Sequence, residues 1–279
     1  MNLNKKLLFG VGLLAVLPVT SSAIVWRNDI SETTVLNYGA GARFQGVGKV
    51  NVGGGFGTGT FLGIGTGGQA WGISAKHVIT SGETGSFTFE DGGSYAISQA
   101  IGFAGADVSV FKINGWNRSV FTPTLSTTGI FTVGANLDSA GYGGHGAEGS
   151  LGGGYGFDER RRGMQTALHS TRTASFGGES QLQLVDLFNS PTNGARPVEG
   201  FGAPGDSGSM LLTDSGQIWG VLSGGQFEQY GAFNYYAAIT PTLAQSIYNV
   251  TGIDPVPEPM TLFAIAGLAG LVARRRRRA

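Results

Sequence analysis

Residues 202–212 read GAPGDSGSMLL, a turn of small residues that carries one Asp-Ser pair and runs into an apolar strand. A nucleophilic serine needs an exposed hydroxyl and nearby backbone N–H groups aimed at the oxyanion that develops during attack. The glycines that flank Asp206 and Ser207 permit a tight turn and a close approach by a substrate. The stretch therefore predicts a nucleophile loop, and the alternative in so glycine-rich a chain is an ordinary hairpin turn.

A serine nucleophile requires a base that titrates near neutral pH and a group that orients this base. His77 ends a strand-like apolar run, whereas His145 and His169 fall in glycine-rich and polar segments, where we expect them in solvent. Asp107 heads the apolar run VSVFKI and is the candidate orienting carboxylate, with turn capping as its alternative role. The candidates follow one another in the order histidine, aspartate, Ser207.

These motifs resemble those of the trypsin-like serine proteases, which have the chymotrypsin fold. Residues 205–208 match that family's Gly-Asp-Ser-Gly, and residues 74–78, SAKHV, resemble its Thr-Ala-Ala-His-Cys. Residues 107–113 resemble its Asp-Ile-Ala-Leu-Leu-Lys-Leu strand. The resemblance covers most of residues 43–250 and implies hydrolysis of peptide bonds in a protein or peptide substrate.

The resemblance implies a role for each matched residue. His77 would act as general base and then acid, Asp107 would orient its imidazole, and Ser207 would form the acyl-enzyme. The backbone N–H groups of Gly205 and Ser207 would form the oxyanion hole. We expect no cofactor and no metal, because cysteine is absent and no cluster of glutamates accompanies the histidines.

Substrate-binding residues are implied in the same way. Ser223, Gly224 and Gly225 resemble the family's Ser-Trp-Gly strand, along which an extended peptide pairs backbone to backbone. Phe201 stands six residues before the nucleophile, where the trypsin branch has the aspartate of its primary specificity pocket. We therefore expect a preference for a small or apolar side chain, not for Lys or Arg.

The composition favours an all-β fold. The 279 residues include 50 glycines but only 13% charged residues, which is typical of short strands and many turns. With the resemblance, this predicts two antiparallel six-stranded β-barrels and a short C-terminal helix. We expect an extended N-terminal arm over 24–42 and a protease domain over 43–253, with barrels over about 43–121 and 130–240 and a helix over about 241–250.

A glycine-rich segment covers residues 134–163 and ends in three arginines, Arg160, Arg161 and Arg162. Its start resembles the glycine-rich opening of the family's second barrel. For the rest we expect a flexible surface loop with the arginines in solvent. A docking patch and a self-cleavage site are the alternatives for the arginine triplet.

Residues 1–23 have the order of a secretory signal peptide: Lys5 and Lys6, an apolar run over 7–19, and small residues up to Ala23. We expect signal peptidase to cleave after Ala23, and the alternative is a buried helix. The chain would then begin with Ile-Val, which resembles the Ile-Val end of the trypsin family. In that family the terminal ammonium pairs with the aspartate before the nucleophile.

The C-terminus reads Pro257-Glu258-Pro259, an apolar segment over 260–273 and five arginines. This order resembles the PEP-CTERM sorting signal of Gram-negative bacteria, over 254–279, and implies processing by an exosortase. The apolar segment is shorter than a comfortable membrane span, so we expect only a transient inner-membrane anchor. Processing would leave the protein at the cell surface or in the extracellular matrix, and the alternative is a simple membrane anchor.

The charge of the central chain argues against nucleic-acid binding. Residues 24–255 hold 11 Lys and Arg against 17 Asp and Glu, a net charge of −6 (11 − 17). A domain with a net negative charge lacks the electrostatic attraction to nucleic acids and to anionic lipids. We expect a monomer.

The function predicted from the sequence is that of an exported serine endopeptidase with a Ser-His-Asp triad. The alternative from another class is a catalytically idle surface or matrix adhesion module built on a protease-like scaffold. A weaker alternative is a serine hydrolase that turns over esters but not peptides. A binding module has no need of all three triad residues, so the intact set favours the enzyme.

Overall fold

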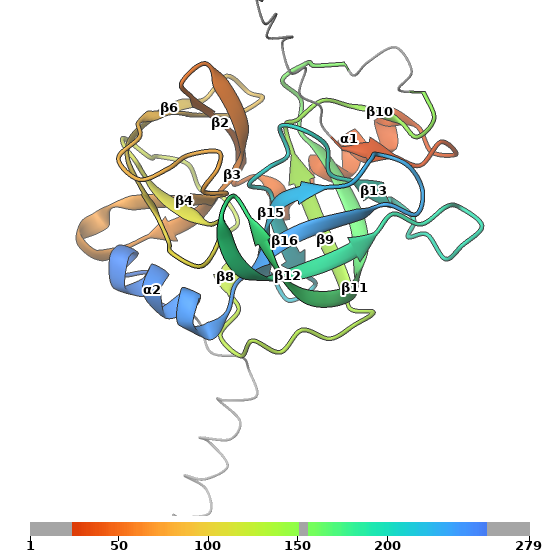
Figure 1. The fold of residues 1–279 in the computed structure, drawn as a ribbon. Coiled ribbons are helices and arrows are strands. Elements are labelled where there is room, and N and C mark those ends of the chain that lie inside the picture. Colours follow the sequence, from red (N-terminus) through yellow and green to blue (C-terminus); the bar gives the residue numbers. More distant parts are fainter. Residues whose placement is uncertain (1–23, 151–155, 256–279) are drawn as a thin grey trace, which may run out of the picture.

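The computed structural model describes residues 24–150 and 156–255 (Figure 1). The predicted signal peptide, the sorting motif Pro257-Glu258-Pro259 and the apolar segment 260–273 lie outside these described residues. Within them, no helix is both long enough and apolar enough to cross a membrane.

The first half of the chain forms a closed six-stranded barrel (Figure 1). Glycines on its inner face leave room for aromatic rings: a Cβ on Gly72 would lie 2.3 Å from the Phe111 ring, and one on Gly48 would lie 2.6 Å from the Phe87 ring. The barrel closes in the order β2-β3-β4-β7-β6-β5. Its strands are β2 (Val47–Val52), β3 (Gly55–Ile64), β4 (Ala70–Ser74), β5 (Gly85–Thr88), β6 (Ser94–Gly102) and β7 (Ser109–Ile113).

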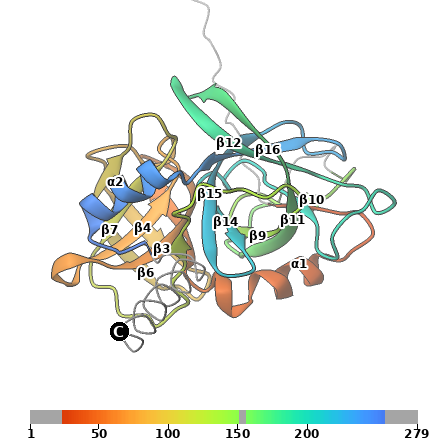
Figure 2. The same ribbon diagram turned by 90° about the horizontal axis from the view of Figure 1, so that it is seen from below.

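The second half forms a seven-stranded sheet in the order β14-β9-β11-β12-β16-β15-β8, beside the first barrel in both views (Figures 1 and 2). Strand β14 also pairs with β15, so six of the strands form a ring of pairings. The all-β prediction is confirmed, with a short additional strand on the second sheet. The strands are β8 (Thr124–Leu125), β9 (Asn136–Gly141), β11 (Arg162–Phe176), β12 (Glu179–Leu187), β14 (Met210–Thr213), β15 (Gln217–Gly225) and β16 (Phe233–Ala238).

The N-terminal segment packs against the second half of the chain. Strand β1 (Val25–Trp26) lies between β10 (Gly146–Ala147) and β13 (Gly200–Phe201). Helix α1 (Glu32–Gly39) follows and lies along β11 (Figure 2). The expectation of an extended arm over 24–42 is therefore wrong, because α1 occupies part of this range. Ser31 caps the helix by accepting a hydrogen bond from the Thr34 N–H.

The chain also forms two short 3₁₀ turns, η1 (Ala42–Phe44) and η2 (Thr66–Gly68).

The C-terminal helix α2 (Pro241–Thr251) packs against the first barrel, as Figure 1 shows. Thr240 caps its first turn, a proline stands at its start, and Gly252 ends it in the left-handed conformation. Its buried face joins a core cluster that holds residues of both barrels. The predicted closing helix is confirmed, and each end of the described chain packs on the barrel formed by the other half.

The glycine-rich segment is more ordered than expected. Strands β9 and β10 lie within residues 134–163, and the side chains of Arg161 and Arg162 are buried. Arg161 donates from Nε to the Gly39 carbonyl over 2.8 Å, and Arg162 pairs with Asp158 over 2.8 Å and with Glu32. The expectation of a solvent-exposed triplet is wrong for these two arginines. Their guanidinium groups can be buried because carboxylates and backbone carbonyls accept the hydrogen bonds that water would otherwise accept.

We predict that docking of α2 stabilises the whole domain. Ile247 is fully buried in the cluster shared by the two barrels. Ile247→Ala should lower the free energy of unfolding by about 2–5 kcal/mol, because it leaves a cavity there. Asn249→Ala, on the exposed face of the same helix, should change it by less than about 0.5 kcal/mol. Urea unfolding of both variants tests this, and equal stabilities would contradict it.

Candidate active site

The segment before Ser207 is a tight turn. The Asp206 N–H donates to the Ala203 carbonyl over 2.9 Å, which closes a four-residue turn. Its second and third residues are Pro204 and Gly205, and Gly205 has a φ of 95°. A type II turn favours proline at its second position and needs a residue with positive φ, usually glycine, at its third. The local sequence therefore determines the conformation of this part of the loop.

A second turn follows directly and carries the serine. The Ser209 N–H donates to the Asp206 carbonyl over 2.8 Å, with Ser207 second and Gly208 third in the turn. Gly208 has a φ of 92°, and a Cβ there would lie 2.1 Å from the Thr58 carbonyl oxygen. Only glycine fits both this backbone conformation and this contact.

Thr58 of β3 holds this loop against the first barrel. Its N–H donates to the Ser207 carbonyl over 2.8 Å, and its hydroxyl donates to the Gly205 carbonyl over 2.9 Å. The same hydroxyl accepts from the Tyr142 N–H over 3.1 Å. Thr58 is fully buried, so water cannot replace these bonds.

His77 and Asp107 are joined by two hydrogen bonds. The His77 ring Nδ1 lies 2.8 Å from Asp107 Oδ2, and the His77 backbone N–H donates to Asp107 Oδ1 over 2.9 Å. The carboxylate can only accept, so it selects the tautomer with the proton on Nδ1. The other ring nitrogen, Nε2, is then free to act as a base.

Gln181 of β12 ties this pair to the second barrel. Its Oε1 accepts from the Asp107 N–H over 2.5 Å, and its Nε2 donates to the Ser223 hydroxyl over 3.3 Å. Gln181 is not among the site residues predicted from the sequence. The alternation in QLQL, residues 181–184, indicates a strand, but not that its glutamines face the interior, where both are buried.

The hairpin that joins β11 and β12 is also tied to the first barrel. Glu179 accepts from Lys76 Nζ over 2.5 Å and from the Gly105 N–H over 2.8 Å. Phe176, at the end of β11, brings its ring centroid to 5.2 Å from that of His77. An aromatic side chain of the second half therefore packs beside the histidine of the first.

One cleft of about 710 Å³ brings the candidate residues together. His77, Asp107, Gly205 and Ser207 all line it. Within the described residues, Ser207 Oγ makes no hydrogen bond to His77. Such a bond often forms fully only when a substrate is present.

Two backbone donors of the serine loop are available to a ligand. The Asp206 N–H is used inside the first turn. In contrast, neither the Gly205 N–H nor the Ser207 N–H donates to any residue that the structure describes. Two free N–H groups on one short loop are what an oxyanion hole requires.

Asp206 is fully buried below the loop. Its two carboxylate oxygens accept from the Gly143 N–H over 3.1 Å and from the Ala203 N–H over 3.0 Å. Burial raises the pKa of Asp206 to about 7. Among the described residues, no lysine, arginine or histidine side chain donates a hydrogen bond to it.

The predicted substrate-binding residues do not line the cleft with Ser207. Ser223 is buried and bonds to Gln181, and the Phe176 ring lies 3.1 Å from the position of a Cβ on Gly224. Phe201 is fully buried, and its ring packs against Gly225.

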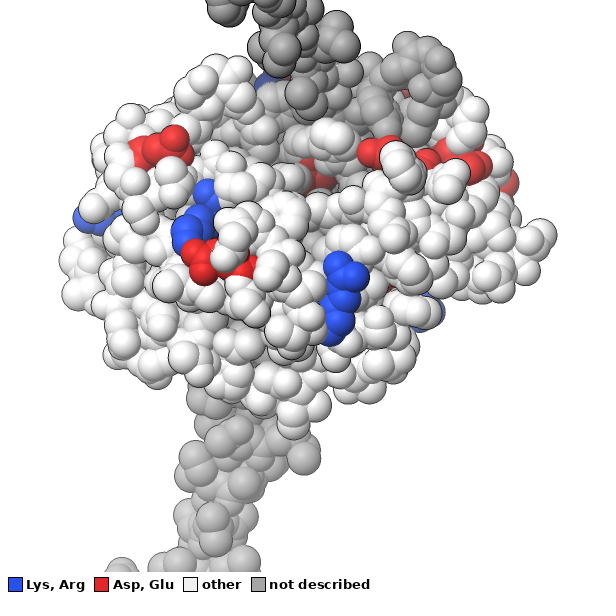
Figure 3. Space-filling model, viewed as in Figure 1, with Lys and Arg blue, Asp and Glu red and all other residues white. Residues whose placement is uncertain are grey.

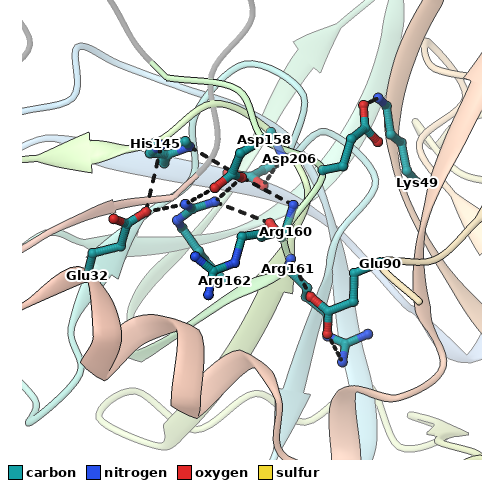
Figure 4. Close-up of polar contacts among 11 residues, drawn as sticks. Glu32, Lys49, Glu90, His145, Asp158, Arg160, Arg161, Arg162 and Asp206 are labelled. Carbon is teal, nitrogen blue, oxygen red and sulfur yellow. Dashed lines mark hydrogen bonds and ion pairs between the residues drawn. The ribbon is translucent and has the colours of Figure 1, made fainter. Parts of the chain in front are cut away.

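A polar cluster near the N-terminal strand is not suited to a metal (Figure 4). Glu32, His145 and Asp158 offer ligand atoms within 4.8 Å of one another, but the guanidinium of Arg162 pairs with both carboxylates. His145 stacks on Trp26, with ring centroids 6.3 Å apart. The expectation of a solvated His145 is therefore wrong. Burial and the nearby positive charge of Arg162 both lower the pKa of the His145 imidazole.

His169 is exposed to solvent, as expected from the sequence.

Comparison with known proteins supports the fold. No family model and no curated protein matches the chain. The structure resembles that of the Rv3671c protease in an inactive form, with a TM-score of 0.52 and 15% identity over 80% of this chain and 97% of that one. The chain has a chymotrypsin-like fold. A serine-to-alanine mutant of Rv3671c from M. tuberculosis, also in an inactive form, gives a TM-score of 0.51 and 16% identity, with 83% and 98% coverage.

We predict that the Thr58 hydroxyl is needed to hold the serine loop. Thr58→Val keeps the shape but leaves the Gly205 carbonyl and the Tyr142 N–H without a partner. The free energy of unfolding should fall by about 1–3 kcal/mol, and reactivity of Ser207 toward a fluorophosphonate should fall with it. Thr58→Ser retains the hydroxyl and is the matched control. If the valine and serine variants react at the same rate, the hydroxyl has no such role.

Proposed function

We propose that this protein is an exported serine endopeptidase. The observation that carries the proposal is the 2.8 Å contact between His77 Nδ1 and Asp107 in the cleft that Ser207 also lines. An oriented base beside a serine on a tight loop with two free N–H groups is the arrangement required for acyl transfer.

In the proposed reaction, Ser207 Oγ attacks the carbonyl carbon of the scissile bond while His77 Nε2 accepts its proton. The oxyanion that forms accepts hydrogen bonds from the Gly205 and Ser207 N–H groups. His77 then gives the proton to the leaving amine, and an acyl-enzyme remains on Ser207. Water then attacks the acyl carbon while His77 Nε2 accepts its proton, and His77 returns this proton to Ser207 Oγ as the bond between Oγ and the acyl group breaks. Asp107 stabilises the imidazolium in both steps.

Export is part of the proposal. Signal peptidase would cleave after Ala23, and an exosortase would process the chain near Pro257-Glu258-Pro259, which would place the protease at the cell surface or in the extracellular matrix.

The partner of the protease would be a protein or peptide substrate. On the face in Figure 3 the charged side chains are few and scattered, so this face offers no concentrated positive charge to attract a nucleic acid.

We predict that Ser207→Ala abolishes both labelling by a fluorophosphonate probe and cleavage of casein. Ser209→Ala, two residues along the same loop, is the matched control and should keep both activities. Persistent labelling of the Ser207 variant would show that another residue is the nucleophile. An unreactive wild-type protein would instead favour the adhesion module, and ester turnover without casein cleavage would favour a different hydrolase.

We also propose that Ile24, once freed by signal peptidase, supplies a hydrogen-bonded cation to Asp206, which accepts hydrogen bonds from no cationic side chain among the described residues. Ile24 and Val25 are buried, and Val25 pairs with Phe201 at the base of the serine loop. A buried carboxylate is stabilised by a paired cation. The new ammonium would hold Asp206 ionised and fix the loop that it anchors.

This gives a prediction about the N-terminus. A protein whose first residue is Ile24 should have a kcat/KM at least about tenfold above that of one that retains Ala23, because a buried charge without its partner costs about 3–5 kcal/mol. Both forms can be released from one fusion protein by cleavage at adjacent sites. Equal activities would rule out a role for the Ile24 ammonium.

A further inference from the structure

Most of the large apolar side chains that the described residues expose come from segments without charge. Residues 50–75, 119–137 and 229–253 contain no Lys, Arg, Asp or Glu. Five of the seven exposed large apolar side chains belong to these three segments. They form what we name the uncharged face: Ile64, Phe121, Ile130, Val133 and Tyr248.

The three uncharged segments meet in space. At the end of β3, a Cβ on Gly63 would lie 3.4 Å from Ile253 Cδ1 and 3.5 Å from Thr122 Cγ2. At the start of α2, a Cβ on Gly129 would lie 2.9 Å from the Pro241 ring. In Figure 1, α2, the yellow-green segment between the barrels and the end of the described chain all lie on the lower side of the molecule. The uncharged face is therefore on the side from which the chain continues to residue 279.

The apolar side chains on this face are exposed although their neighbours pack inward. Ile130 and Val133 are 70% and 64% exposed, whereas the ring of Phe131 between them packs against Trp219, with centroids 5.5 Å apart. Ile64 ends β3 and is 54% exposed. A group of exposed apolar side chains is costly in water, and on a soluble domain it marks a surface that contacts a partner or a lipid.

Few charges adjoin the uncharged face. Lys112 lines a hollow together with Tyr248, and Asp254 directly follows the last uncharged segment. Asp214 precedes a turn glycine whose Cβ position lies 2.8 Å from the Phe121 ring. The lower edge of the molecule in Figure 3 shows no charged side chain. The face therefore offers apolar contact, without the dense positive charge that would select an anionic partner.

The chain beyond the described residues indicates which partner this face meets. Only residues 255–259 separate Asp254 from the apolar segment 260–273. A chain reaches at most about 3.6 Å per residue, so Met260 lies within about 22 Å of Asp254. The apolar segment has 14 residues, whereas a membrane-spanning helix needs about 20. Insertion of so short a segment on so short a connection brings this side of the domain to the bilayer surface.

We propose that the uncharged face rests on the lipid bilayer while residues 260–273 are inserted in it. The proposal rests on the export and anchoring in the proposed function, not on its chemistry. The exposed apolar side chains enter the boundary between headgroups and acyl chains, and this second contact strengthens an anchor that is weak alone. No residue of the face lines the cleft with Ser207, so the cleft stays open to substrates.

The test uses single cysteines, because the chain contains none of its own. A fluorophore is attached to the full chain at Ile64→Cys, Ile130→Cys or Val133→Cys, and the protein is bound to phosphatidylcholine vesicles that contain nitroxide-labelled phosphatidylcholine. We expect the nitroxide to quench each label at least about twofold more than a label at Phe227→Cys. Phe227 is the matched control, because it is 80% exposed but follows the far end of β15, whose first residue pairs with Thr124.

A charge on the face should weaken the contact. Val133→Asp, added to the protein labelled at Ile130→Cys, should lower the quenching at least about twofold, because a carboxylate is costly to place among acyl chains. Val133→Leu is the matched control and should keep the quenching. High salt should leave the quenching unchanged, because salt screens charges and the face carries none.

Several results would overturn the proposal. These are equal quenching at all four labels, quenching at none of them in a chain that floats with the vesicles, and a chain that does not float at all. A dimer in detergent solution, with no quenching by lipid at Ile130, would assign the face to a second copy of the chain instead. Loss of fluorophosphonate reactivity at Ser207 would contradict the proposed chemistry alone, because the quenching does not depend on it.

Discussion

A single buried threonine of the first barrel holds the serine loop of the second. Thr58 bonds to the carbonyls of Ser207 and Gly205, and Gly208 lets the loop approach it closely. The candidate triad depends on this contact, because its base and its orienting carboxylate come from one barrel and its nucleophile comes from the other. Gln181 makes the reverse connection, from the second barrel to Asp107.

The packing of the chain ends reinforces the same interface. The N-terminal strand β1 lies against the base of the serine loop, and the C-terminal helix α2 completes the core shared by both barrels. Arg162, at the end of the glycine-rich segment, pairs with Glu32 of α1 and with Asp158, so α1 is tied to the second barrel by charge as well as by packing. Loss of either end should therefore loosen the cleft, although neither end contributes a residue to it.

Local motifs of this chain can be predicted from its sequence, whereas its long-range contacts cannot. The turn around Ser207 follows from Pro204, Gly205 and Gly208, whose conformational preferences act within a few residues. The all-β class followed from composition, and α2 from a short apolar periodicity. Thr58 and Gln181 carry no local signal, because their roles depend on partners that lie far away in the chain. Helix α1 was missed because only Val35 and Gly39 of its residues are buried, which leaves almost no periodic pattern.

The proposed reaction requires one arrangement, in which Ser207 Oγ meets the His77 base of the other barrel and the oxyanion meets the N–H groups of Gly205 and Ser207. The most direct measurement is a crystal structure of the protein after reaction with a fluorophosphonate. We expect phosphorus bonded to Ser207 Oγ and one phosphoryl oxygen within hydrogen-bond distance of the Gly205 and Ser207 N–H groups, with His77 Nε2 beside the adduct. A phosphoryl oxygen directed to solvent, or an adduct on another residue, would contradict it.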